Sequence, residues 1–274
     1  LTLARQLKNN RLRVTVVEKS DEGSLKNPAY DGREIALTHL SREIMQRLGM
    51  WQRIDENEIY RLRDAKVFNG TSDYTLHFPE PTKARGGATD RLGYLISNHH
   101  IRRAAYEEAA ACSNVQLLCN MGVKNVETNE NRALVKLEND DVITARLLIA
   151  ADSRFSQTRR QLGIAADMHD FGRTVIVFRT RHELSNQHTA NECFLYGRTL
   201  ALLPLEEHLT NCVITINNTQ SHELLDLSPE DLAREAQQML NNRLGNMEIA
   251  GTVHTYPLVS AHARTFYGTR CALI

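Results

Sequence analysis

Residues 143–164 read ITARLLIAADSRFSQTRRQLGI, and the interpretation of the whole chain starts from them. The apolar run Leu147–Ala151 has the length of a buried strand, and Asp152 and Ser153 end it. Ser156 to Leu162 are expected to form a short helix that Gly163 closes. A strand that delivers an Asp to a helix N-terminus can bind an anion through N–H groups and a sugar hydroxyl through the carboxylate. The alternative is an ordinary strand–helix joint in which Asp152 only caps the helix.

The composition excludes several classes of protein. The chain has 274 residues, enough for one large domain or two closely joined ones. Lys+Arg and Asp+Glu number 33 each, so no net field attracts nucleic acid or an anionic membrane. The five cysteines are odd in number and lack C-x-x-C spacing, which argues against a disulfide framework or a zinc site and favours a reducing, cytoplasmic compartment. No apolar run approaches the roughly 20 residues of a membrane span.

A second strand is predicted from Arg13 to Glu18, with the acid at its carboxyl end. In a dinucleotide-binding βαβ unit such an acid accepts hydrogen bonds from the ribose, although a lone acid after a strand is more often solvated surface. The G-x-G-x-x-G turn that should precede this strand is absent, and no turn follows the final strand pattern, TRCALI. We therefore expect the chain to be a fragment.

Arg33 and Asn98 are further candidates. Arg33 lies in a Gly-containing turn before a helical pattern that Ser41 is expected to cap, and it is either a phosphate or ribose ligand or a surface cation. Asn98 opens a helix predicted to end at Ala111, where it either caps the helix or donates to a ligand. The doublet His99–His100 has no companion acids, so no metal site is predicted.

The remaining pattern predicts a meander in the first half and an antiparallel sheet in the second. The predicted elements are a hairpin of residues 64–69 and 74–78 turning at Asn69-Gly70-Thr71, a loop at 79–88, strands at 92–96, 115–118, 123–128, 133–138, 142–150, 174–181, 194–203, 212–217 and 249–257, and a helix at 229–243 capped by Ser228. Arg173, Phe178 and Phe194 are expected to share the floor of a substrate sheet.

Five stretches together resemble the flavoprotein aromatic-ring monooxygenases of the para-hydroxybenzoate hydroxylase type, and most closely the hydroxylases of ubiquinone biosynthesis. The stretches are TVVEK, DGREIALTHLSREIMQRLGMWQRI, LGYLISNHHIRRA, LLIAADSRFSQTRRQLGI and NNRLGNMEIAGTVHTYPLVSAHARTFYGTRCALI. The resemblance implies an α/β fold in which a Rossmann-like FAD-binding domain (1–63, 98–167 and 259–274) is interleaved with an antiparallel-sheet α+β substrate domain (64–97 and 168–258).

The resemblance also implies a set of cofactor-binding residues. Glu18 would bind the ribose and Arg33 the ribityl-diphosphate, while Asn98 would contact the flavin chain and Val123 the adenine. Asp152 and Arg159 belong to a motif that serves both the flavin and the nicotinamide. The glycine of that motif is Ser153 here, which would put a side chain in the way of the cofactor. No catalytic residue is predicted.

The implied function is FAD-dependent hydroxylation of an aromatic ring with NAD(P)H and O₂, on a polyprenyl phenol of ubiquinone biosynthesis. Such a protein would be cytoplasmic, with peripheral contact at the inner membrane or in a biosynthetic complex. Three alternatives stay open: a monooxygenase of a small soluble phenol, a catalytically silent scaffold member, and a Rossmann-type reductase, which the antiparallel second half disfavours. The family also has a Gly-Asp-Ala flavin motif that should follow Ile274, and without it and the G-x-G-x-x-G turn the chain alone is expected to be inactive and colourless.

Overall fold

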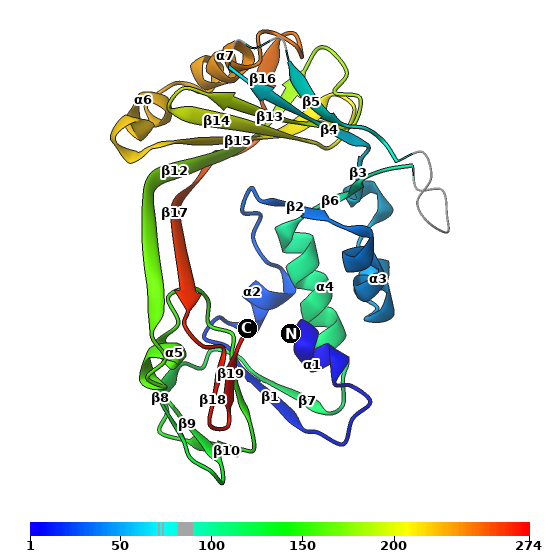
Figure 1. The fold of residues 1–274 in the computed structure, drawn as a ribbon. Coiled ribbons are helices and arrows are strands. Elements are labelled where there is room, and N and C mark those ends of the chain that lie inside the picture. The colour runs from blue at the N-terminus through cyan, green and yellow to red at the C-terminus, as the bar shows by residue number, and fades with distance from the viewer. Residues whose placement is uncertain (71, 73, 82–89) are drawn as a thin grey trace. The chain divides into compact units, whose positions relative to one another are not determined.

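The protein is described from a computed structural model, which covers residues 1–70, 72, 74–81 and 90–274 (Figure 1). The chain forms two compact units. Unit 1 comprises residues 1–26, 109–171 and 259–274, and unit 2 comprises residues 27–108 and 172–258. Two long strands, β12 (Ala166–His182) and β17 (His254–Ala263), contribute residues to both units. The fold is mixed α/β, as predicted.

Unit 1 contains two pairs of parallel strands and a meander. Strand β1 (Val14–Val17) is parallel to β7 (Val115–Leu118), and β11 (Leu148–Ala150) is parallel to β19 (Cys271–Leu273). A short strand, β18 (Tyr267–Gly268), extends the second pair. The predicted meander is confirmed: its strands are β8 (Val123–Thr128), β9 (Ala133–Leu137) and β10 (Val142–Ala145). Its core is made by alternate apolar residues, Val126, Val135 and Leu137, which all face one side. The helices of unit 1 are α1 (Thr2–Gln6), α2 (Glu22–Lys26) and α5 (Gln157–Gln161).

Unit 2 contains a small antiparallel sheet and most of the longest helix. The sheet has the order β2 (Glu34–Leu37), β6 (Gly93–Ser97) and β3 (Tyr60–Leu62), with β6 buried along its whole length. The helical elements are α3 (His39–Arg47), the 3₁₀ turns η1 (Trp51–Arg53) and η2 (Glu56–Glu58), and α4 (Asn98–Ala110), whose last two residues belong to unit 1.

The large sheet of unit 2 is mostly antiparallel. Its order is β16 (Met247–Ile249), β12, β15 (Leu209–Asn217), β14 (Arg198–Pro204), β13 (Thr189–Leu195), β4 (Asp64–Asn69) and β5 (Thr75–Phe78), and β17 pairs with β12. One face carries the main apolar core, formed with α6 (Ser221–Leu225) and α7 (Pro229–Met239), which follow the turn η3 (Asn218–Gln220) (Figure 1). Because side chains alternate along a strand, the intervening residues lie on the opposite face, called here the open face.

The face assignment shows that one prediction is wrong. Phe178 is fully buried in the core under α7, together with Ile176. Arg173 is an odd number of positions away on the same strand and therefore lies on the open face. Phe194 also lies on the open face, because its neighbour Cys193 belongs to the core. Phe178 consequently cannot share a substrate floor with the other two residues.

Several predicted boundaries also need correction. Thr38, not Ser41, caps α3: its hydroxyl accepts a hydrogen bond from the Ser41 N–H at 3.2 Å. The single strand predicted at 194–203 is interrupted by a hairpin turn between β13 and β14, where Gly197 has a φ of +79°. The strand predicted at 249–257 breaks at Gly251, and the helix capped by Ser228 ends at Met239.

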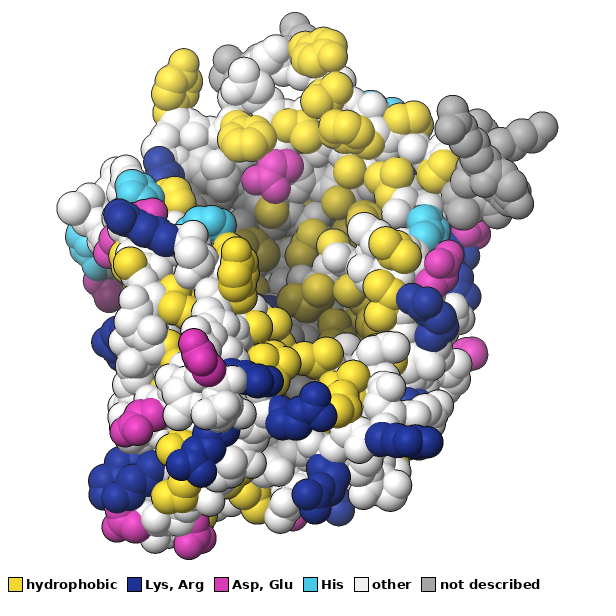
Figure 2. Space-filling model, turned by 60° about the horizontal axis from the view of Figure 1, so that its bottom comes forward, with side chains coloured by type: hydrophobic (Ala, Val, Ile, Leu, Met, Phe, Trp, Pro, Cys, Tyr) yellow, Lys and Arg dark blue, Asp and Glu magenta, His cyan; other side chains and the backbone are white. Residues whose placement is uncertain are grey.

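The predicted hairpin of β4 and β5 is confirmed by their antiparallel pairing, although Thr71 in its turn lies outside the described residues. Residues 82–89, which include most of the predicted loop, also lie outside them. Basic and acidic side chains are interspersed over the lower part of the surface shown in Figure 2, as the balanced charge requires. None of the described helices has the length and apolar character that a membrane span needs.

Candidate functional site

The predicted site residues fall in both units, and those of each unit are described by themselves. Glu18, Val123, Asp152 and Arg159 belong to unit 1. Arg33 and Asn98 belong to unit 2.

Glu18 directly follows β1 and is held in place by the parallel strand pair. Its N–H donates to the Leu118 carbonyl at 2.9 Å, and its own carbonyl accepts from the Met121 N–H at 3.0 Å. One carboxylate oxygen accepts from the Ser20 N–H at 2.9 Å, and the other has no hydrogen-bond partner among the described residues. This half-buried carboxylate therefore keeps one oxygen available to accept from a ligand hydroxyl.

Asp152 stabilises the start of helix α5. One of its carboxylate oxygens accepts from the Thr158 N–H at 2.9 Å, and the other accepts from the Ser156 hydroxyl. Burial by itself raises the pKa of Asp152, but these hydrogen bonds outweigh it and lower the pKa below its ordinary value. Arg159 is also engaged locally, since its guanidinium donates to the Ile164 carbonyl at 2.6 Å. The capping role considered for Asp152 is thus present in the structure.

Ser153 occupies the glycine position of the family motif in a glycine-like conformation. Its φ is +75°, in the left-handed region that residues with a Cβ rarely adopt. The Ser153 carbonyl accepts from the Ser156 N–H at 3.0 Å and so holds this turn. Ser153 therefore adopts a backbone conformation that glycine enters readily.

A cavity of about 300 Å³ opens beside this turn within unit 1. Its wall combines the polar turn with small and apolar residues from β12, β17 and β19. The residues that line it are Ala150, Asp152, Ser153, Arg154, Ser156, Arg159, Ala166, Ala261, Ala263, Phe266, Leu273 and Ile274. Neither Glu18 nor Val123 is among them. Val123 instead begins β8, next to a register shift, and packs against the meander core.

In unit 2 the structure brings Arg33 and Asn98 together through Asp31, a residue that sequence reasoning missed. The Asp31 carboxylate accepts from the Arg33 guanidinium at 2.5 Å and from the Asn98 amide at 2.8 Å. The Asn98 N–H donates to the Arg33 carbonyl at 2.9 Å. Burial raises the pKa of Asp31, but the bonds from Arg33 and Asn98 outweigh it and leave the pKa lowered. The signal in the sequence was an Asp two positions before the Arg in the same turn.

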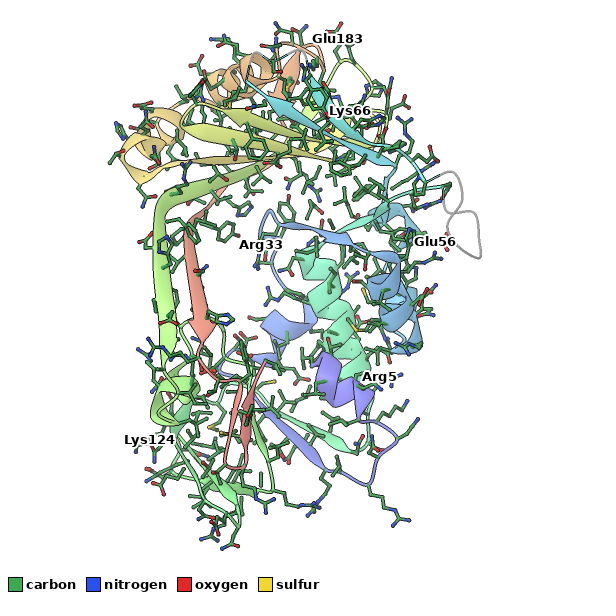
Figure 3. All side chains as sticks on the ribbon, in the orientation of Figure 1. Arg5, Arg33, Glu56, Lys66, Lys124 and Glu183 are labelled. Atoms are coloured by element: carbon green, nitrogen blue, oxygen red, sulfur yellow. The ribbon has the colours of Figure 1, made fainter. Side chains whose placement is uncertain are left out.

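Arg33 lies in the turn immediately before β2, where its side chain can reach a ligand (Figure 3). Half of the Arg33 side chain is exposed, at 50%. Gly32 has a φ of +76°, and a Cβ there would lie 2.7 Å from a ring carbon of His254, so only glycine fits. Tyr256 donates its hydroxyl to the Asp31 carbonyl and lies under the Arg33 guanidinium. The guanidinium is therefore pre-positioned while part of it faces solvent.

Two of the buried polar groups in unit 2 that lack hydrogen-bond partners lie next to each other. The Tyr30 hydroxyl and the His99 Nδ1 are buried and have no hydrogen-bond partner among the described residues. Their rings contact each other edge to face, with centroids 5.5 Å apart. Burial, with smaller contributions from His100 and Arg179, lowers the pKa of His99 to about 4, so its imidazole is neutral at pH 7. No cluster of potential metal ligands occurs among the described residues.

The chemistry of these groups suits a flavin dinucleotide. A half-exposed guanidinium and an amide can donate to phosphate, and a carboxylate at a strand end can accept from ribose. The unpartnered Tyr30 hydroxyl and His99 nitrogen leave buried hydrogen-bonding capacity that a polar ligand can satisfy. A mixed α/β fold with donors suited to phosphate and an acceptor suited to ribose is typical of the class of nucleotide-binding proteins.

The comparisons with known proteins give the family. Residues 1–270 match the FAD binding domain family, so the chain belongs to it. The whole chain is 62% identical to ubiquinone hydroxylase UbiM of Neisseria meningitidis and 27% identical to ubiquinone hydroxylase UbiL of Rhodospirillum rubrum. It spans 59% of the length of the first relative and 62% of the second.

Solved structures agree in fold. The whole chain aligns with 74% of PqsL, a probable FAD-dependent monooxygenase from Pseudomonas aeruginosa, at a TM-score of 0.73 and 16% identity. It aligns with 71% of 2-methyl-3-hydroxypyridine-5-carboxylic acid oxygenase at a TM-score of 0.74 and 16% identity. The predicted fold class and family resemblance are confirmed.

Proposed function

We propose that the full-length gene product is an FAD-dependent monooxygenase that hydroxylates an aromatic ring with NAD(P)H and O₂. The observation that carries this proposal is the Asp31 bridge between Arg33 and Asn98, in a chain that matches the FAD binding domain family over residues 1–270. A bound flavin supplies the redox chemistry that activates O₂ for transfer to an electron-rich ring.

The residues of this chain position the cofactor. Arg33 places a cation at the diphosphate, and Asp31 fixes its direction. Asn98 donates from its amide to the flavin chain, and the free oxygen of Glu18 accepts from the ribose. Val123 presents its backbone to the adenine. Asp152 and Arg159 keep the Ser153 turn in shape beside its cavity and thereby serve the flavin and the nicotinamide.

We assign residues 1–63, 98–167 and 259–274 to a FAD-binding domain and residues 64–97 and 168–258 to a substrate domain. The substrate we propose is a polyprenyl phenol of ubiquinone biosynthesis, because the two ubiquinone hydroxylases cited above align with the whole chain. A polyprenyl substrate partitions into lipid, so we place the protein in the cytoplasm with peripheral contact at the inner membrane or in a biosynthetic complex.

The test uses the full-length gene product reconstituted with FAD. We expect NAD(P)H oxidation and O₂ uptake to depend on an added phenol, and a hydroxylated product to appear by mass spectrometry. Arg33→Gln should weaken FAD binding about tenfold or more, since a hydrogen bond to a charged group contributes about 1.5–3 kcal/mol. The matched control, Arg47→Gln, changes an exposed arginine of α3 and should leave FAD affinity unchanged.

Absence of FAD binding, or flavin binding without any phenol-dependent turnover, would contradict the proposal. The second outcome combined with retained binding to partner proteins would favour the silent scaffold. A small soluble phenol that is hydroxylated at least as well as a prenylated one would favour the small-phenol monooxygenase.

A further inference from the structure

Glu192 occupies the middle of the open face of the large sheet. It lies on β13, where its register partners are Ala201 on β14 and Val67 on β4. These register partners form a row across the sheet, which continues to Val213 on β15 on one side and to Leu76 on β5 on the other. The neighbours of Glu192 on β13, Cys193 and Leu195, belong to the helix-covered core, so its carboxylate points to the open face.

Most of the neighbours of this carboxylate are apolar. Ala190 and Phe194 flank it on its own strand, and Leu203 lies diagonally on β14, whereas the diagonal positions Thr199 on β14 and Asn69 on β4 are polar. Three large apolar side chains of this face are substantially exposed: Leu76 at 42%, Phe78 at 48% and Phe194 at 47%. An exposed apolar surface on a sheet, with small residues at its centre, is typical of a ligand-binding surface.

Glu192 is half-buried there and has no hydrogen bond or ion pair among the described residues. Burial alone raises the pKa of its carboxyl group. An acid placed among apolar side chains without a partner lowers the stability of the fold, so its presence calls for a function. A ligand that donates a hydrogen bond would satisfy it.

Two arginines of β12 on this face already have partners. The Arg179 guanidinium lies 2.6 Å from the Glu34 carboxylate, whose side chain is fully buried. Arg173 donates to the Gly197 carbonyl at 3.4 Å. The exposed Arg181 lies four positions along β12 from the row of Glu192, so a ligand carboxylate in that row would meet the unpaired acid and not this cation.

We propose that Glu192 accepts a hydrogen bond from a ring hydroxyl of the aromatic substrate and selects neutral phenols over aromatic acids. The inference rests on the proposed monooxygenase function and specifies its substrate class. The ring lies against Phe194 and Val67, where the small side chains of Ala190 and Ala201 leave room for a flat group. The hydroxyl meets the carboxyl oxygen, and a substrate carboxylate is disfavoured there by like charge and desolvation.

The experiment compares ligands and variants of the full-length, FAD-loaded protein. Binding of para-cresol, its methyl ether and para-hydroxybenzoate is measured by calorimetry, and KM and kcat are measured for the phenols. For Glu192→Ala we expect the dissociation constant and KM of para-cresol to rise about tenfold, with no change for the methyl ether. Glu192→Gln keeps an acceptor oxygen, so its dissociation constant and KM for para-cresol should stay within about threefold of wild type.

The same variants test exclusion of acids. Glu192→Gln should improve the binding of para-hydroxybenzoate relative to para-cresol by about tenfold, since a like charge is removed. Glu248→Gln, an exposed acid on β16 of the same sheet, is the matched control and should alter none of these values.

The outcomes separate the two proposals. Equal losses of affinity for para-cresol and its methyl ether in Glu192→Ala would overturn the role of Glu192, because the residue would then only maintain the surface. Failure of the wild-type protein to bind any phenol would overturn it as well. Phenol binding that depends on Glu192, without turnover in the wild-type protein, would instead support the role of Glu192 in binding and contradict the proposed monooxygenase function.

Discussion

The Arg179 guanidinium donates to the Glu34 carboxylate at 2.6 Å, although the two residues are 145 positions apart in the chain. The Ser97 hydroxyl donates to both oxygens of Glu34, at 2.9 and 2.7 Å, and accepts from Arg179 at 2.8 Å. The Arg179 guanidinium also lies over the Tyr30 ring. This network connects β12 of the large sheet to β2 and β6 of the small sheet within unit 2.

The first prediction concerns this network. Arg179→Met leaves the fully buried Glu34 carboxylate without its cation, and we expect the free energy of unfolding to fall by about 3–5 kcal/mol. The double variant Arg179→Met/Glu34→Met should recover most of the loss. Urea denaturation measures both values. Arg181→Met, an exposed position on the same strand, is the control and should stay within about 0.5 kcal/mol of wild type. A double variant no more stable than Arg179→Met would contradict the explanation.

The second prediction concerns the left-handed turn. Ser153 has a φ of +75°, so Ser153→Gly should relieve backbone strain. Glycine also increases the entropy of the unfolded chain, and we expect a net gain of about 0.5–1 kcal/mol. Ser153→Ala keeps the Cβ and should show no gain. Thermal unfolding measures the difference, and a destabilised Ser153→Gly variant would mean that the serine side chain makes a favourable contact.

The third prediction concerns pH and Asp152. The pKa of Asp152 is lowered in the folded state, so its contribution to stability is present above the unfolded pKa of 3.8 and is lost as pH falls through the folded value. Asp152 as a whole residue is exposed, although its hydrogen-bonded carboxylate is partly covered, and we expect Asp152→Asn to cost about 0.5–1 kcal/mol at pH 7. The difference from wild type should shrink below about pH 4. Unfolding curves at both pH values check this, with the exposed loop variant Glu130→Gln as the control.

The fourth prediction concerns pH and Glu192, and its sign is opposite. The folded-state pKa of Glu192 is raised, so stability is lost as pH rises through that value. Glu192→Gln should therefore match wild type near pH 4 and have a higher Tm at pH 7. Glu248→Gln should have the wild-type Tm both near pH 4 and at pH 7. A Tm difference that does not vary with pH would show that the carboxylate of Glu192 is not destabilised by burial.

Much of the fold followed from local patterns. Alternation of apolar residues predicted the meander strands, and Ser228 before Pro229 correctly placed the start of α7. The errors occurred where a turn interrupts a continuous apolar pattern. The hairpin between β13 and β14 was missed because residues 194–203 are mostly apolar and carry a single glycine as the turn signal, the left-handed Gly197. Periodicity cannot distinguish one long strand from two paired ones.

The candidate site was predicted unevenly. Arg33 and Asn98 meet at Asp31, whereas the prediction had treated them as separate ligands of a cofactor. Asp152 and Arg159 take part in local capping and turn contacts. That Glu18, Arg33, Asn98 and Asp152 all bind the cofactor, as the family resemblance implies, stays a prediction. Measuring FAD affinity after each single substitution addresses that prediction directly.

The sequence by itself determined the family and most of the order of elements, because these depend on short-range periodicity and contiguous motifs. Only the tertiary structure decided which residues share a face and which charges find partners. Strand register places Phe178 under α7 and Glu192 on the open face. A shift of one residue in either strand would move its side chain to the opposite face of the sheet. Arg179 has a buried partner and Glu192 has none among the described residues, and long-range contacts alone create that difference.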